Sequence, residues 1–161
     1  MHSTADVDSI DGIVVALYAS VSFPSGGAPD WARFRSLFDP AALLIRIDPR
    51  MTSLPPSERE APAMVASPVD AFIERTQAMV DAGHLRAFEE HELVRRTEVF
   101  GDLAQVFSSY ERSADDRPIV RGVNSLQLVK DGVRWWIAAV CWTDESPENP
   151  LPSRFLPRPS P

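Results

Sequence analysis

The fold is decided by residues 86–143, which read RAFEEHELVRRTEVF GD LAQVFSSYERSADDRPIVRGVNSLQLVK DG VRWWIAAVCWT. Apolar and polar residues largely alternate along this stretch, which is the period of a half-buried strand. We predict four long strands, at residues 86–100, 103–113, 119–130 and 133–143. Gly101-Asp102 and Asp131-Gly132 are two-residue hairpin turns, with glycine where φ must be positive. The stretch therefore predicts an antiparallel meander.

Three helices are predicted before the meander. In the first, apolar residues recur at steps of three and four from Val7 to Val21, with Asp6 or Asp8 as the N-cap. The second begins after Asp30 and ends at Asp39-Pro40, and the third runs from Ser67-Pro68 to Gly83. A short strand is predicted at residues 43–47 and a long loop at residues 48–62. This order predicts an α+β domain whose helices lie on one face of the sheet.

Length and composition bound the remaining choices. The 161 residues fit one domain. We predict a flexible N-terminus at residues 1–6, a single domain at residues 7–146 and a proline-rich tail at residues 147–161. The tail holds six prolines. Its one suggested role is docking, through Phe155 and Leu156 lying over a neighbouring surface.

Charge and cysteine usage exclude several classes of protein. The formal net charge of -7 argues against binding to a nucleic-acid backbone. No apolar run reaches the roughly 18 residues of a membrane span, and no basic stretch precedes an apolar core as in a secretion signal. Cys141 is the only cysteine, so no intrachain disulfide can form. We therefore predict a cytoplasmic protein that binds neither nucleic acid nor membrane.

The order of elements resembles the nuclear transport factor 2-like superfamily, and several segments are similar to its functionally unassigned bacterial members. These segments are Phe100-Gly101, residues 104–111 (AQVFSSYE), residues 121–129 (RGVNSLQLV) and residues 134–142 (RWWIAAVCW) with Glu145. The resemblance implies a strongly curved, mainly antiparallel sheet wrapped round a helix as a cone-shaped barrel with a pocket at its wide end. It also implies a homodimer packed through the outer face of the sheet.

The superfamily includes ketosteroid isomerases, scytalone dehydratase, polyketide cyclases and limonene epoxide hydrolases, so the fold alone does not fix the reaction. The tyrosine and aspartate set of the ketosteroid isomerases does not map onto this sequence. Scytalone dehydratase relies on a histidine pair, whereas this chain has only His2, His84 and His91.

Three residues are candidates for catalysis: His91, Tyr110 and Glu92. Alternation places His91 with Glu89 on one face of its strand, and Glu90 with Glu92 on the other. His91 or a pocket carboxylate is the candidate base, and the alternative is a solvated strand rim. Tyr110 is the candidate hydrogen-bond donor to a developing oxyanion, and the alternative is a structural hydroxyl.

Six residues are candidates for ligand binding: Tyr18, Trp31, Ser108, Tyr110, Asn124 and Trp142. Ser108 and Tyr110 share a face with small and apolar side chains, as a pocket wall would. Asn124 has apolar neighbours on its face, so its amide is either satisfied by the core or directed at a ligand. Aromatic residues as dense as Trp31 and Trp142 can form pocket walls, although they can equally be core or a dimer seam.

The last strand carries apolar residues on both faces. Alternation puts Trp136, Ala138, Val140 and Trp142 on one face, and Trp135, Ile137, Ala139 and Cys141 on the other. Helices would cover one face and a second copy of the chain the other, which supports a homodimer.

The sequence thus favours a small-molecule-binding protein with an apolar pocket that takes a small apolar molecule. The alternative is a cofactor-independent lyase, isomerase or cyclase that uses a pocket carboxylate or histidine as base. A third reading is an interaction module that works through dimerisation and the proline-rich tail. We expect no cofactor and no metal, because no nucleotide-binding signature or converging ligand set is present.

Overall fold

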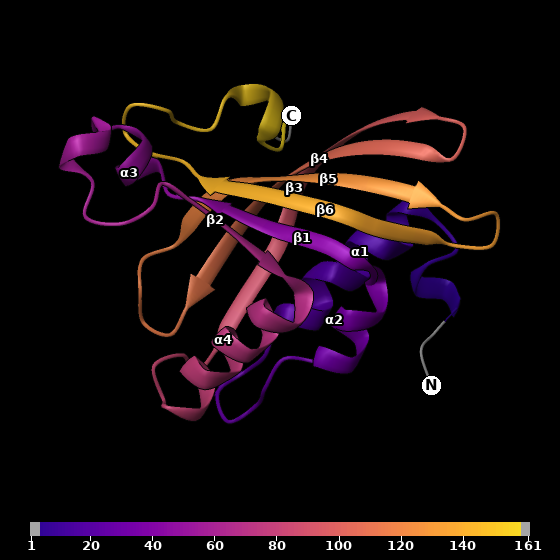
Figure 1. The fold of residues 1–161 in the computed structure, drawn as a ribbon, viewed down its shortest axis with the longest axis horizontal. Coiled ribbons are helices and arrows are strands. Elements are labelled where there is room, and N and C mark those ends of the chain that lie inside the picture. Colours follow the sequence, from indigo (N-terminus) through magenta and orange to yellow (C-terminus); the bar gives the residue numbers. More distant parts are fainter. Residues whose placement is uncertain (1–3, 159–161) are drawn as a thin grey trace.

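A six-stranded mixed sheet forms the centre of the computed structural model, which describes residues 4–158 (Figure 1). Its strands are β1 (Phe38–Ile47), β2 (Met64–Pro68), β3 (Phe88–Phe100), β4 (Leu103–Ala114), β5 (Val120–Lys130) and β6 (Trp135–Asp144). They lie in the order β2-β1-β6-β5-β4-β3, and only β1 and β6 are parallel neighbours. The predicted meander is confirmed, and Gly101 and Gly132 have the positive φ that their turns require.

The helices are α1 (Ile10–Val21), α2 (Trp31–Leu37), the single turn α3 (Pro49–Thr52) and α4 (Val69–Asp81). In addition, 3-10 turns lie at Thr4–Asp6, Pro56–Glu58 and Ser153–Phe155. Figure 1 shows α1, α2 and α4 together on one side of the sheet, as predicted for an α+β fold. Among the described residues, no helix is long and apolar enough to cross a membrane.

Several boundaries differ from the prediction: β3 and β6 each begin two residues later, and α3 and the 3-10 turn Pro56–Glu58 lie within the predicted loop at residues 48–62. Three other differences have a local physical reason. Ser9, rather than Asp6 or Asp8, caps α1, because its hydroxyl accepts from the backbone N–H of Gly12 at 2.9 Å. β1 begins at Phe38 and takes in Asp39-Pro40, which was predicted to end a helix. Ser67 and Pro68 belong to β2, so the predicted capping hydroxyl of Ser67 is wrong and α4 begins without a side-chain cap.

The core forms where α1 and α2 press on the concave face of the sheet. Ile13 and Val14 of α1 are fully buried, as are Leu126 of β5 and Ile137 of β6. Burial of one such side chain contributes about 1.5–3 kcal/mol to the free energy of unfolding. The apolar stripe of α1 therefore holds the helices to the sheet.

A β-bulge in β6 corrects the predicted faces of the last strand. The pairing of β5 with β6 shifts register between Gln127 and Leu128, which inserts one extra residue into β6. Because a bulge reverses the alternation beyond it, Trp135 and Ile137 face the core on the same side as Val140 and Trp142. Trp136 lies on the outer face, where the guanidinium of Arg134 covers its ring at 3.6 Å.

The curved sheet is open and does not close into a barrel. β2 and β3 are its two edges. β2 has only five residues and passes directly into α4. The helices occupy the space between the edges, with α4 against β1 and β2, and α1 against β3.

The C-terminal segment crosses the outer face of the sheet (Figure 1). Ser109 of β4 is fully buried, and its hydroxyl donates to the backbone carbonyl of Phe155 at 2.7 Å. The ring of Phe155 lies 6.2 Å from that of Phe107. Residues 1–3 of the predicted flexible N-terminus and residues 159–161 of the predicted tail lie outside the described residues. The homodimer through this face stays a prediction.

Gly122 of β5 is the position where a side chain fits least. A Cβ there would overlap the hydroxyl of Tyr110 and the backbone oxygen of Thr143. We expect Gly122→Ala to lower the free energy of unfolding by about 1–3 kcal/mol, because overpacking forces neighbouring groups to move. Urea denaturation measures this change.

Ser125→Ala is the control on the outer face of the same strand, where the hydroxyl accepts one hydrogen bond within the described residues, from Nε2 of Gln105. We expect it to cost less than about 1 kcal/mol. Equal losses in the two variants would contradict the close packing at Gly122.

Candidate functional site

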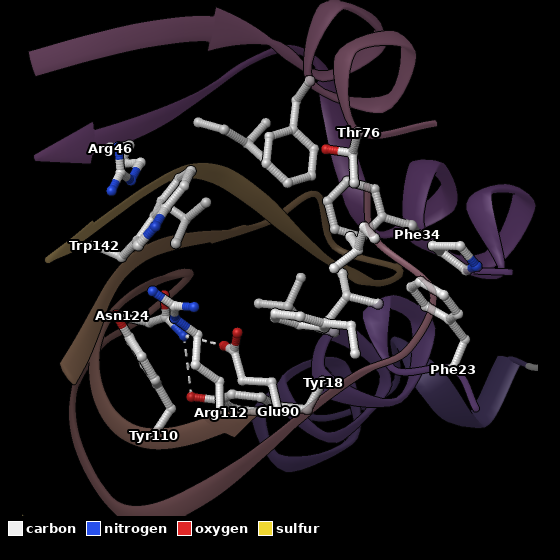
Figure 2. Close-up of a pocket in the computed structure, with 18 of the residues that line it drawn as sticks. Tyr18, Phe23, Phe34, Arg46, Thr76, Glu90, Tyr110, Arg112, Asn124 and Trp142 are labelled. Carbon is white, nitrogen blue, oxygen red and sulfur yellow. Dashed lines mark hydrogen bonds between the residues drawn. The ribbon is translucent and has the colours of Figure 1, made fainter. Parts of the chain in front are cut away.

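A pocket of about 470 Å³ lies between the concave face of the sheet and the helices (Figure 2). Five of the six predicted ligand-binding residues line it: Tyr18, Trp31, Tyr110, Asn124 and Trp142. The sixth, Ser108, is fully buried behind the wall and contacts the hydroxyl of Tyr18. The structure thus brings together a set of residues that come from α1, α2, β4, β5 and β6.

Aromatic rings form one wall of the pocket. Phe72 of α4 lies edge-on to Trp142 at 6.0 Å and edge-on to Trp31 at 6.4 Å. Phe34 stacks on Phe72 at 5.6 Å. The indole N–H of Trp31 donates to Gln77 at 2.6 Å, which leaves its ring to the apolar surface. This wall suits a flat or aliphatic molecule.

A chain of hydrogen bonds runs behind the pocket wall. Asn124 donates from Nδ2 to the Tyr18 hydroxyl at 3.1 Å, and that hydroxyl lies 2.7 Å from Oγ of Ser108. Ser108 donates its single hydroxyl hydrogen to Glu92, so the Tyr18 hydroxyl must donate to Ser108. Burial raises the pKa of Tyr18. Tyr18 is therefore a neutral link in this chain, and its proton is already committed.

A second group of polar residues surrounds Asp144 at the end of β6. The Tyr110 hydroxyl donates to one Asp144 oxygen at 2.7 Å, and Nη2 of Arg112 donates to the other at 2.9 Å. Burial raises the pKa of Tyr110, and the charge of Asp144 raises it further. The structure thus commits the hydroxyl of Tyr110, the predicted oxyanion donor, to Asp144.

Glu90 of β3 presents a carboxylate to the pocket between these two groups (Figure 2). Its oxygen accepts from Nδ2 of Asn124 at 3.2 Å. Burial raises the pKa of Glu90 to about 7, whereas the bond from Asn124 and the charge of Arg112 oppose that rise. Among the described residues, Glu90 forms no ion pair within 4.0 Å. Glu90 can therefore gain or lose a proton near neutral pH.

Arg112 lies directly opposite Glu90 in the register of β3 and β4, and its guanidinium also lines the pocket. The guanidinium of Arg112 carries five N–H donors. Within the described residues, its side chain forms one hydrogen bond, to Asp144. Both N–H groups of the Asn124 amide are used, as are the hydroxyl hydrogens of Tyr18 and Tyr110. Arg112 is thus the group near Glu90 with donors left for a ligand.

The other two predicted catalytic residues lie away from the pocket. His91 lies on the outer face of β3, 54% exposed, with Nε2 3.6 Å from a carboxylate oxygen of Glu111. Glu92 faces inward but is held by Arg95, whose Nη2 donates to it at 2.8 Å. Neither lines the pocket. The exposed position of His91 fits the alternative of a solvated strand rim, whereas Glu92 is held in an ion pair with Arg95.

Sequence reasoning did not single out Glu90, Arg112 or Asp144. The run Glu89-Glu90-His91-Glu92 reads as a wet strand edge, and only the packing of α1 against β3 shows that Glu90 is covered. Alternation did place Glu90 on the other face of the strand from His91, and this is the signal that could have identified Glu90. Within residues 4–158, no cluster of three or more His, Cys, Asp or Glu side chains is placed to hold a metal ion.

Comparison of the sequence with known proteins finds no matching family model and no matching curated protein. Solved structures do match. One is a nuclear transport factor 2-like protein of unknown function from Shewanella baltica, 14% identical over 83% of this chain and 91% of that one, with a TM-score of 0.53.

Two other similar structures carry functional names. A provisionally named ketosteroid isomerase from Shewanella frigidimarina is 14% identical over 88% of this chain and 95% of that one, with a TM-score of 0.55. A type 2 hexachlorocyclohexane dehydrochlorinase is 10% identical over 90% of this chain and 92% of that one, with a TM-score of 0.53.

The chain has the nuclear transport factor 2-like fold. Identities this low establish the fold alone, so the chemistry of this nuclear transport factor 2-like domain rests on its own residues.

The protonation of Glu90 couples the stability of this nuclear transport factor 2-like domain to pH. The folded state keeps its proton up to about pH 7, whereas an unfolded glutamate loses it at about 4.3. The free energy of unfolding therefore falls as pH rises between these values. We expect Glu90→Gln to remove this fall and to be more stable than the wild type above neutral pH, by about 3–4 kcal/mol.

Urea denaturation of both proteins between about pH 4 and about pH 8 measures the difference. Glu89→Gln, on the exposed outer face of the same strand, is the matched control and should track the wild type. A Glu90→Gln advantage that does not change with pH would contradict the raised pKa.

Proposed function

We propose that the protein binds a small, largely apolar carbonyl compound in this pocket and that Glu90 acts on it as a general base. The observation that carries the proposal is the setting of Glu90. Its carboxylate lies in an apolar pocket, and its hydrogen-bond partner is an amide rather than a cation. A carboxylate in that setting is a stronger base than one in an ion pair.

The proposed step balances within the pocket. An oxygen of Glu90 takes a proton from the carbon next to the carbonyl, and the electron pair of that C–H bond moves to the carbonyl oxygen. The enolate oxygen so formed is stabilised by the remaining N–H groups of Arg112. Return of the proton to a different carbon gives an isomerisation, and loss of a leaving group from the next carbon gives an elimination.

The structural neighbours support this reaction class only by name. One is named as an isomerase and another as a dehydrochlorinase. Both names describe chemistry that a positioned base can start. Neither substrate is carried over to this protein.

Ligand binding without chemistry is the second candidate function. The observation that favours it is that both tyrosine hydroxyls in the pocket donate within the protein, to Ser108 and to Asp144. A pure binding protein needs only the apolar wall and a few satisfied polar groups.

Deuterium exchange distinguishes the two candidates. A panel of cyclic enones and aryl ketones is screened for binding by calorimetry, and bound compounds are then incubated with the protein in D₂O. We expect catalysed exchange at the carbon next to the carbonyl, read by NMR. Glu90→Gln should slow this exchange by about 10²- to 10⁴-fold, because an amide cannot accept the proton.

Glu89→Gln is the control and should leave the exchange rate unchanged, because Glu89 lies on the exposed outer face. Compounds that bind in the pocket without catalysed exchange would favour the binding role. Equal exchange by the wild type and Glu90→Gln would remove Glu90 as the base.

The pH dependence of the exchange gives a separate check. Glu90 must be ionised to accept a proton, so kcat/KM should rise with pH through the pKa of about 7 and then level off. The charged or polar groups that act on Glu90 or respond to its charge are Arg112, Asp144, Asn124, Tyr18 and Tyr110. A profile that falls over this range would contradict a carboxylate base.

A further inference from the structure

Arginines gather round the pocket of an otherwise acidic protein. The chain has a net charge of -7, yet the described residues that line the pocket include Arg46, Arg75, Arg112 and Arg117 against one carboxylate, that of Glu90. Arg112 lies beside Glu90, at the end of the pocket where the proposed proton transfer takes place. The other three lie on β1, on α4 and in the β4–β5 connection. This excess of positive charge favours a ligand with negative charge.

Arg46 and Arg75 come from different elements to the same end of the pocket. Nη1 of Arg75 donates to Oγ of Ser67 at 3.1 Å, and Ser67 pairs with Leu44 across β2 and β1. Arg46 is two residues beyond Leu44 on the same face of β1, which places it about 7 Å along the strand. Figure 2 shows Arg46 beside Trp142, its register partner in β6.

The charges of these two arginines are largely uncompensated. Arg46 is 46% exposed and lies 3.8 Å from Asp48, whose carboxylate Arg50 holds at 3.0 Å. Arg75 forms no ion pair with any residue in the described range, and its guanidinium lies 5.9 Å from the centre of the Phe72 ring. Both side chains therefore keep N–H donors for an anion.

An apolar surface separates this end from Glu90. Arg46, Trp142 and Asn124 are side by side in β1, β6 and β5, so two strand spacings, roughly 10 Å, separate the backbone of Arg46 from that of Asn124, whose amide holds Glu90. The rings of Trp142 and Phe72 lie along this path. The pocket thus has a cationic end, an apolar middle and a proton-transfer end.

We propose that the ligand is an amphiphilic anion, with an apolar body and a carboxylate-like oxyanion that Arg46 and Arg75 bind at the end remote from Glu90. This inference rests on the proposed function, since it names the substrate class of the same pocket. The guanidinium groups would pair with the oxyanion, and Trp142 and Phe72 would pack on the apolar body.

Two fluorescent probes that share one apolar body test the proposal. Anilinonaphthalene sulfonate carries an oxyanion, and N-phenylnaphthylamine has the same rings without charge. We expect the double variant Arg46→Gln/Arg75→Gln to weaken binding of the sulfonate about tenfold or more, because it loses charge-assisted hydrogen bonds. Binding of the neutral probe should change less than about twofold, and added salt should weaken the sulfonate selectively.

Two controls separate this inference from the proposed function. Arg96→Gln changes an exposed arginine on the outer face and should affect neither probe. Trp142→Ala removes part of the shared wall and should weaken both. If Trp142→Ala weakens both probes but the arginine variants do not change the sulfonate, the anionic ligand is wrong and the pocket stands. If Trp142→Ala changes neither probe, the binding pocket itself is contradicted.

Discussion

The arrangement of the pocket depends on the hydrogen bond from the buried hydroxyl of Tyr110 to the carboxylate of Asp144. It joins β4 to β6 across β5, and the ring of Tyr110 reaches that position because Gly122 has no side chain to obstruct it. Asp144 in turn holds Arg112. Gly122, which has no side chain, therefore determines where the guanidinium of Arg112 lies, and Arg112 is the cation beside Glu90.

This arrangement gives two neighbouring carboxylates different properties. Asp144 accepts hydrogen bonds from the hydroxyl of Tyr110 and from Arg112, whereas the one donor to the Glu90 carboxylate within residues 4–158 is the amide of Asn124. The structure places an ionisable carboxylate beside apolar rings without a direct counter-ion. Such a site can move a proton or leave a bound molecule unchanged, and the choice depends on what occupies the pocket.

Local signals in the sequence predicted the meander, the helices before it and five of the residues that line the pocket. The turns at Gly101 and Gly132 mark the ends of strands. Their positive φ depends on the glycine itself, so the local sequence is enough to predict them. β2 was missed because its five residues are paired only through distant β1, and Pro68 resembles a helix start. The faces of β6 could not be read by alternation, since the bulge depends on pairing with β5. Glu90 was missed because its burial depends on a helix about 70 residues earlier in the chain.

The C-terminal segment has a consequence for any assembly of this protein. The buried Ser109 hydroxyl and the ring of Phe107 are already in contact with Phe155, so the outer face at β4, next to the β3 edge, is occupied by the chain itself. A second copy that docks on this face must either include Ser153–Phe155 in its footprint or lift that turn away. Truncation of the chain before Ser153 would thus enlarge the surface open to a partner and leave the Ser109 hydroxyl with the backbone carbonyl of Val94, at 3.2 Å, as its acceptor.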